Sequence, residues 1–167
     1  TKIYLSNINL NKNLKIKDFK KAEIKTSSND LKNNDFIIEK KNKVKISGEI
    51  FDAEPLIKML YKKNRKKILD KDFNTEVILK FKQTLTGTGD KVSDLSMIAN
   101  INKGFYTKIS LKGNFEGNEI IEMSLYQINQ DKKSLQVISD RAKPFIKNFN
   151  FIEGFEEGKL EYTSTIT

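Results

Sequence analysis

The chain has 167 residues, a formal net charge of +9, 37% hydrophobic and 32% charged residues, and no cysteine or histidine. The lack of both residue types excludes a Ser-His-Asp or Cys-His catalytic site, a zinc site built on thiolate or imidazole, and a disulfide framework. Twenty-one isoleucines and eleven phenylalanines are too many for a disordered tail. The length and composition therefore predict one folded unit with a hydrophobic core.

The positive charge comes almost entirely from lysine, because the chain has 29 lysines and only two arginines. Arginine is the preferred residue for bidentate contacts with phosphates and bases, so its scarcity argues against a nucleic-acid partner. The densest basic segment, residues 61–67, fits either a surface that binds nucleic acid or anionic membranes, or a solvated helix end. We favour the solvated helix end and expect no nucleic-acid partner.

Paired carboxylates are the only catalytic groups that the composition leaves. Glu153, Glu156 and Glu157 cluster near the C-terminus, and Asp70 and Asp72 share a loop. No apolar pocket that would raise a carboxyl pKa is predicted around either group, so we interpret both as turn and surface residues. We therefore expect no enzymatic activity, no metal site and no cofactor.

The N-terminal part of the chain contains the first alternating segments. Apolar and polar residues alternate at residues 3–5 and 8–10, whereas residues 11–42 contain few apolar side chains. Alternation resumes over residues 44–52, which predicts a β-strand. A short amphipathic helix is predicted over residues 53–60, because a proline stands in its first turn and an aspartate precedes it.

The stretch from residue 75 to residue 139 has the longest alternation in the chain. It predicts four long antiparallel strands in a meander, with turns at residues 87–90, 102–104 and 116–118. Each strand is apolar on one side and polar on the other. The predicted fold class is therefore mainly β, with a long antiparallel meander sheet and two short helices.

The helix start Ala53-Glu54-Pro55 has a counterpart 89 residues later, Ala142-Lys143-Pro144, and these two prolines are the only ones in the chain. Each segment follows a strand that ends in an aspartate, and each continues with two apolar residues and a lysine. We predict an internal repeat of strand, short helix and strand at about residues 44–60 and 135–149. The two copies should superpose, including the strand that follows the helix.

A sheet with one apolar face must cover that face. A second sheet or the helices could close it into an ordinary core, whereas incomplete cover would leave an apolar groove of the kind that holds lipid. The alternation alone supports both interpretations. The residues that a period of two places on this face, and that would line a groove, are Val77, Leu79, Phe81, Leu95, Met97, Ile101, Ile109, Leu111, Met123 and Leu125.

The C-terminal part of the chain has a strand ending in Ser-Asp-x-Ala, a short helix with an apolar residue three positions after the alanine, and a strand beginning Gly-x-Leu. Upstream, residues 44–52 read as strand, Ser-Gly, strand and Asp, and residues 111–115 read Leu-Lys-Gly-Asn-Phe. In these motifs the chain resembles AsmA-like proteins, in particular envelope proteins of the YhdP/TamB type, over about residues 44–166. The departures from the pattern are Pro144 and Lys159. The matching positions are Gly48, Asp52, Ser139, Asp140, Ala142, Phe145, Gly158 and Leu160.

The resemblance implies an elongated, twisted antiparallel sheet, folded into a groove between the inner and outer membranes of a diderm bacterium. It also implies that the groove holds phospholipid acyl chains on their way to the outer membrane, in the periplasm. A membrane helix outside this sequence would tether the protein to the inner membrane, so we expect the chain to be one segment of a larger elongated β protein. Two other interpretations stay open, a basic module that binds nucleic acid or an anionic membrane surface, and a structural β-repeat domain without a ligand.

Overall fold

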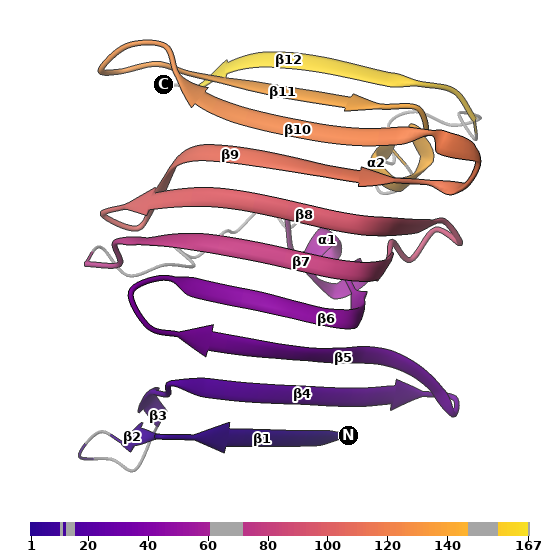
Figure 1. Cartoon of the computed structure of the whole chain (residues 1–167). Helices are drawn as coiled ribbons and strands as arrows, with labels where there is room; N and C mark the ends of the chain where they lie inside the picture. Colours follow the sequence, from indigo (N-terminus) through magenta and orange to yellow (C-terminus); the bar gives the residue numbers. More distant parts are fainter. Residues whose placement is uncertain (11, 13–15, 61–71, 147–156, 167) are drawn as a thin grey trace.

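The computed structural model describes residues 1–10, 12, 16–60, 72–146 and 157–166, and these residues fold mainly as β-strands (Figure 1). The long strands are β1 (Lys2–Ser6), β4 (Lys21–Ser28), β5 (Leu31–Lys40), β6 (Val44–Asp52), β7 (Thr75–Leu85), β8 (Lys91–Asn102), β9 (Phe105–Asn114), β10 (Ile120–Gln127), β11 (Lys133–Ser139) and β12 (Leu160–Ile166). The shorter elements are β2 (Asn9–Leu10), β3 (Ile16–Asp18), α1 (Glu54–Leu60), the 3-10 turn η1 (Glu116–Asn118) and α2 (Lys143–Ile146).

The ten long strands form one sheet in the order β1-β4-β5-β6-β7-β8-β9-β10-β11-β12, so β1 and β12 are its edges. Strands β2 and β3 form a separate two-stranded ladder. The predicted fold class is confirmed, because the described chain is mainly β, has one long curved sheet, and contains two short helices.

The predicted four-stranded meander contains five antiparallel strands, β7 to β11. The additional strand arises because a turn at residues 128–132 separates β10 from β11. Within that turn the Asn129 side chain accepts hydrogen bonds from the backbone N–H groups of Asp131 and Lys132, each at 3.0 Å. An asparagine that bonds the following backbone in this way stabilises a turn.

One strand pair departs from the antiparallel pattern. Strands β6 and β7 run parallel, with Val44 opposite Val77 and Asp52 opposite Leu85. The segment between these strands includes α1, and parallel neighbours need a long crossover connection of this kind. The sheet is therefore mixed, with the parallel pair near its centre.

Residues 1–42 contribute three strands to the sheet, β1, β4 and β5, although residues 11–42 contain few apolar side chains. In β4, Ala22 and Ile24 share one face, and they pair with Ile38 and Phe36 of β5. Two apolar residues on each strand suffice because the other side of β4 and β5 faces solvent and needs none.

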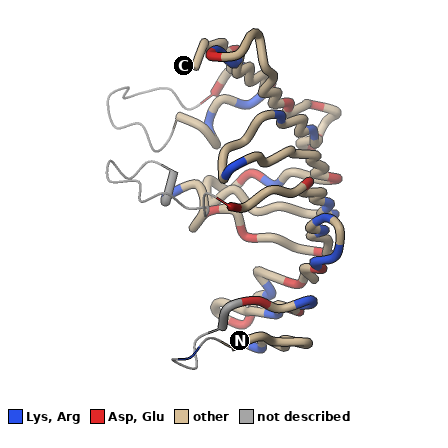
Figure 2. Tube along the Cα trace, turned by 90° about the vertical axis from the view of Figure 1, so that its left-hand side faces the viewer, with Lys and Arg blue, Asp and Glu red and all other residues tan. Residues whose placement is uncertain are grey.

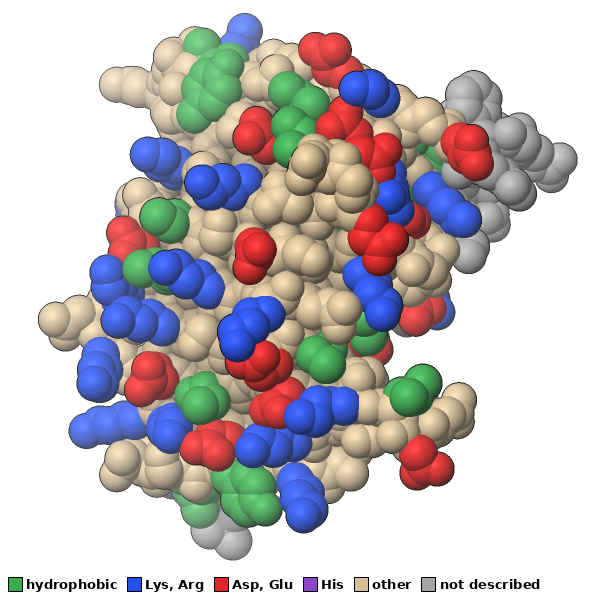
Figure 3. All heavy atoms as spheres, turned by 45° about the vertical axis from the view of Figure 1, so that its right-hand side comes forward, with side chains coloured by type: hydrophobic (Ala, Val, Ile, Leu, Met, Phe, Trp, Pro, Cys, Tyr) green, Lys and Arg blue, Asp and Glu red, His purple; other side chains and the backbone are tan. Residues whose placement is uncertain are grey.

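The sheet is curved, and its two faces differ in character. Seen along the strands it forms an arc, and α1 and α2 lie on the concave side (Figures 1 and 2). The core residues alternate along the strands with the charged residues of the convex side, so they face the concave side. The convex side carries intermixed lysine, aspartate and glutamate side chains, with separate apolar side chains between them (Figure 3).

The deepest part of the core lies on β7 and β8 and reaches the end of β9. Its buried members are Phe81, Val92, Leu95 and Phe115. Val92 and Leu95 are three residues apart, yet both are buried, because the β8–β9 register shifts between Ser93 and Ser96 and the backbone φ of Asp94 is 50°. A bulge of this kind changes which side chains face the core, so strict alternation does not predict it.

The two copies of the predicted repeat agree as far as the start of the helix. In each copy the alanine N–H donates to a backbone carbonyl outside the helix, Ala53 to Leu85 at 2.9 Å and Ala142 to Gly158 at 2.7 Å. In each copy the alanine carbonyl also accepts a bond from the N–H four residues later. The following strands differ, because β7 runs parallel to β6 whereas β12 runs antiparallel to β11. The prediction that the next strand would superpose is therefore wrong.

Candidate lipid-binding face

All ten residues predicted to share an apolar face do share one face of the sheet. Val77 pairs with Ala99, which pairs with Ile109, and Ile109 pairs with Leu125. A second row across the same four strands is Leu79, Met97, Leu111 and Met123. Phe81 pairs with Leu95, and Ile101 lies two residues beyond Ala99 on the same side of β8.

The ten side chains differ in how completely they are covered. Phe81, Leu95, Ile101 and Leu125 are buried, with exposed fractions below 10%. The remaining members are half-buried, so the folded chain covers them only in part: Val77, Leu79, Met97, Ile109, Leu111 and Met123. We call this set of ten residues the concave apolar face. Its buried part belongs to the core, and its half-buried part leaves apolar surface accessible.

Gly48 has a packing role on this face. It lies in β6 between Phe36 of β5 and Phe81 of β7. The rings of Phe36 and Phe81 meet edge to face with centroids 5.6 Å apart, and Phe51 stacks on Phe81 at 4.8 Å. A Cβ at position 48 would lie 2.5 Å from the Phe36 Cβ and 2.2 Å from the Asp35 carbonyl oxygen. Glycine is therefore the residue that lets the three rings meet across β6.

Asp52 joins the end of β6 to α1. Its Oδ1 accepts a hydrogen bond from the backbone N–H of Glu54 at 3.1 Å, which satisfies a donor at the start of the helix. Its Oδ2 accepts a second bond from the Asn33 side chain at 3.2 Å. Asp52 therefore fixes the point at which the chain leaves the sheet.

Ser139 and Asp140 end β11 with hydrogen bonds to neighbouring segments. The Ser139 side chain is only 1% exposed, and its hydroxyl donates to the Arg141 carbonyl at 2.7 Å. The Asp140 carboxylate accepts bonds from Lys159 at 2.7 Å and from the backbone N–H of Ile120 at 2.9 Å. These bonds, with that from Lys159 the stronger, lower the pKa of the Asp140 carboxyl below its usual value.

The last four positions of the family pattern surround α2. Ala142 is buried, and its N–H bonds the Gly158 carbonyl. Gly158 has a φ of 115°, a conformation that glycine adopts readily. The half-buried Phe145 donates its N–H to the Ala142 carbonyl at 2.9 Å, and Leu160 pairs with Ser139. All eight positions of the pattern therefore have structural roles here.

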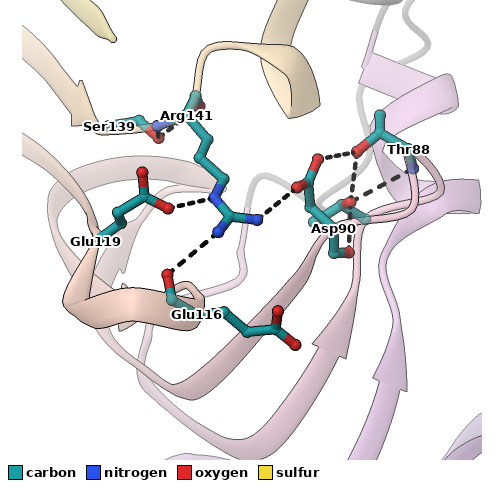
Figure 4. Close-up of polar contacts among 7 residues, drawn as sticks. Thr88, Asp90, Glu116, Glu119, Ser139 and Arg141 are labelled. Carbon is teal, nitrogen blue, oxygen red and sulfur yellow. Dashed lines mark hydrogen bonds and ion pairs between the residues drawn. The ribbon is translucent and has the colours of Figure 1, made fainter. Parts of the chain in front are cut away.

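Arg141 forms a polar cluster at the same end of the sheet (Figure 4). Its guanidinium donates to Asp90 at 2.9 Å, to Glu119 at 2.5 Å and to the Glu116 carbonyl at 3.1 Å. The bonds with Asp90 and then Glu119 raise the pKa of Arg141. Its Cζ also lies 5.2 Å from the centre of the Phe115 ring.

Sequence reasoning missed this cluster, although one signal was present. Arg141 is one of only two arginines among 31 basic residues, and arginine is the side chain suited to several directed hydrogen bonds at once. Its partners come from the β7–β8 turn and the β9–β10 connection, which are far from it in sequence. The cluster holds three connections together and leaves the arginine engaged with acidic partners.

Several predicted features cannot be placed. The basic segment 61–67, the loop residue Asp70, and Glu153 and Glu156 lie outside the described residues. Within the described part, no cluster of three or more acidic side chains has the arrangement of a metal site. Among the described helices, none combines the length and apolarity needed to cross a bilayer.

No family model, no curated protein and no solved structure matches this chain. The resemblance to AsmA-like proteins therefore stays a prediction, which depends on the motifs in the sequence.

Proposed function

We propose that this chain is a segment of a bridge-like envelope protein whose concave apolar face carries phospholipid acyl chains between the inner and outer membranes. The observation that carries the proposal is the partial cover of the concave apolar face. Six of its ten residues remain half-buried on an unclosed ten-stranded sheet. In the full-length protein this segment would lie in the periplasm, tethered to the inner membrane.

The physical reason is the cost of moving an acyl chain through water. Transferring a chain of ~16 carbons from water to hydrocarbon is worth about 12 kcal/mol, at about 0.8 kcal/mol per methylene. A continuous apolar surface removes most of that cost along the path of the lipid. Such a surface needs no catalytic residue, which fits a chain without histidine or cysteine.

The arrangement of polar groups also fits this role. The register places Lys80, Ser96, Lys112 and Glu122 in one row across the convex face, opposite the apolar row that contains Leu79. One sheet can thus contact acyl chains on its concave side and water on its convex side.

Photo-crosslinking from the two faces tests the proposal. A photoreactive residue at Leu79 or Leu111 should capture phospholipid, and the same residue at the neighbouring Lys80 or Lys112 should not. The adjacent positions are matched controls, because neighbours along a strand point to opposite sides. Captured lipid would be identified by mass spectrometry of the purified, crosslinked protein.

Salt separates this proposal from binding to a charged surface. Acyl burial is not screened, so capture at Leu79 or Leu111 should persist in 1 M salt, where attraction between lysines and headgroups is screened within ~3 Å. Equal capture from both faces, or capture that disappears at high salt, would contradict the proposal and favour a basic surface binder.

A further inference from the structure

Large apolar side chains are exposed at one end of the sheet, where Tyr106 pairs with Ile101 of the concave apolar face. They stand at the tips of the β8–β9 and β10–β11 hairpins, on the left in Figure 1, whereas α1 and α2 lie toward the opposite end. Their exposed fractions are 55% for Phe105, 42% for Tyr106, 50% for Tyr126 and 53% for Ile128. We call these four residues the aromatic rim.

The two hairpin tips lie close together in space. Lys133 reaches across β10 from β11, and its Nζ donates to the Tyr106 carbonyl at 2.9 Å. Residue Gln127 at the end of β10 pairs with Lys133, and Lys133 pairs with Ile166 of β12. The register therefore brings the two tips and the end of β12 to the same level of the sheet.

Backbone hydrogen bonds hold the rim in place. In the β8–β9 tip, Lys103 and Gly104 have φ values of 51° and 73°, as in a tight two-residue hairpin turn. Their N–H groups donate to the Asn74 side chain at 2.8 Å and to the Phe73 carbonyl at 3.0 Å. The β10–β11 tip is closed by the Asn129 bonds described above. The three rings of the rim therefore stand in strands next to hydrogen-bonded turns, which lowers the entropy lost on binding.

Lysines are frequent in the hairpin tips at this end of the sheet. The tip segments 39–45, 102–108 and 126–133 together contain eight lysines and two acidic residues. Two of these lysines form ion pairs with acidic residues of the same end, Lys40 with Asp18 and Lys43 with Glu76. The opposite end, in contrast, gathers Glu54, Asp90, Glu116 and Glu119 around α1 and the Arg141 cluster. The sheet thus has one end that is apolar and basic.

We infer that the aromatic rim docks this chain onto the surface of an anionic phospholipid bilayer. Tyrosine and phenylalanine with flanking lysines are the side chains that favour the membrane–water interface, where rings enter the headgroup layer and lysines meet anionic lipids. A nucleic acid would use the lysines and stack bases on the rings, but it offers no hydrocarbon layer to the exposed Ile128. This inference uses different residues from the concave apolar face and does not rest on the proposed function.

A single tryptophan tests the docking, because the chain has none of its own. In Phe105→Trp, emission should shift to shorter wavelength on addition of vesicles of phosphatidylcholine and phosphatidylglycerol at 7:3, and brominated lipids should quench it. The matched control is Leu31→Trp, at the β4–β5 tip on the opposite end, where Leu31 is 75% exposed. Its emission should stay that of a solvated indole.

Replacement of the rim gives an independent measurement. Changing Phe105, Tyr106, Tyr126 and Ile128 together to serine should lower co-sedimentation with these vesicles at least about tenfold. Each replacement removes a large apolar side chain from the contact with the bilayer. Circular dichroism would check that this variant is folded. Changing Lys103 and Lys132 to glutamate should weaken binding to the anionic vesicles in the same assay.

Three results would overturn the inference. They are equal shifts for the two tryptophan variants, no shift for either, or a Phe105→Trp signal that responds to single-stranded DNA or a protein but not to vesicles. The two proposals can fail separately, because lipid capture at Leu111 reports on the concave apolar face, whereas the emission of the Phe105→Trp variant reports on the rim.

Discussion

Gly48 shows how one residue without a side chain controls the packing of three aromatic rings. In Gly48→Ala the new methyl group would collide with backbone and Cβ atoms of β5, which cannot rotate away. We expect a loss of about 2 kcal/mol or more in the free energy of unfolding, measured by urea denaturation. Ser47→Ala, at the exposed neighbouring position, should change it by less than about 0.5 kcal/mol. Equal stability of the two variants would contradict the packing role of Gly48.

A pH dependence of stability is expected from Asp140. Its pKa is lower in the folded state than the unfolded value of about 4, so its stabilising contribution is complete above pH 4 and is lost as the pH falls through the folded pKa. The difference in unfolding free energy between the wild type and Asp140→Asn should therefore be largest near neutral pH and shrink below pH 4. Thermal unfolding across pH 2.5 to 7 would measure it.

The partner of Asp140 provides the check. Lys159→Met removes the principal cause of the lowered pKa, so it should reproduce part of the same pH-dependent difference. A difference that stays constant between pH 2.5 and 7 would show that the Asp140–Lys159 pair does not contribute through charge.

At the scale of an element, strand β8 shows how the two faces of the sheet differ. Met97 lies on the concave apolar face, whereas Ser96 lies between Lys80 and Lys112 on the convex face. Met97→Asp should lower the free energy of unfolding by about 2 to 4 kcal/mol, because it places a carboxylate among apolar groups. Ser96→Asp should change it by less than about 0.5 kcal/mol, since two lysines flank the site. Equal losses in chemical denaturation would mean that the register is shifted by one residue.

At the scale of the whole molecule, stability should fall from the centre of the sheet to its edges. The buried core lies on β7 and β8, while β1 and β12 each pair on one side only. Hydrogen exchange measured by mass spectrometry should therefore be at least about tenfold slower in β7 and β8 than in β1 and β12. Uniform protection across the ten strands would indicate that the sheet opens only as one unit.

The same scale shows which parts of the candidate site were predictable. Alternation along each strand correctly placed ten residues on one face, because the period of two is a property of the extended backbone itself. It did not predict that Val92 joins them, since the bulge at Asp94 depends on how β8 meets β9. It also could not separate the buried from the half-buried members, because cover comes from segments distant in the sequence.

The sequence by itself determined the fold class, the meander without its division into five strands, the ten residues that share one face, and the two helix starts, all of which depend on neighbouring residues. Only the tertiary structure decided that β6 and β7 run parallel, that β12 folds back antiparallel to β11, and that Arg141 meets Asp90 and Glu119. These choices join segments far apart in the chain. The free energy that favours these pairings and contacts comes from the sheet as a whole, so no local pattern of residues specifies them.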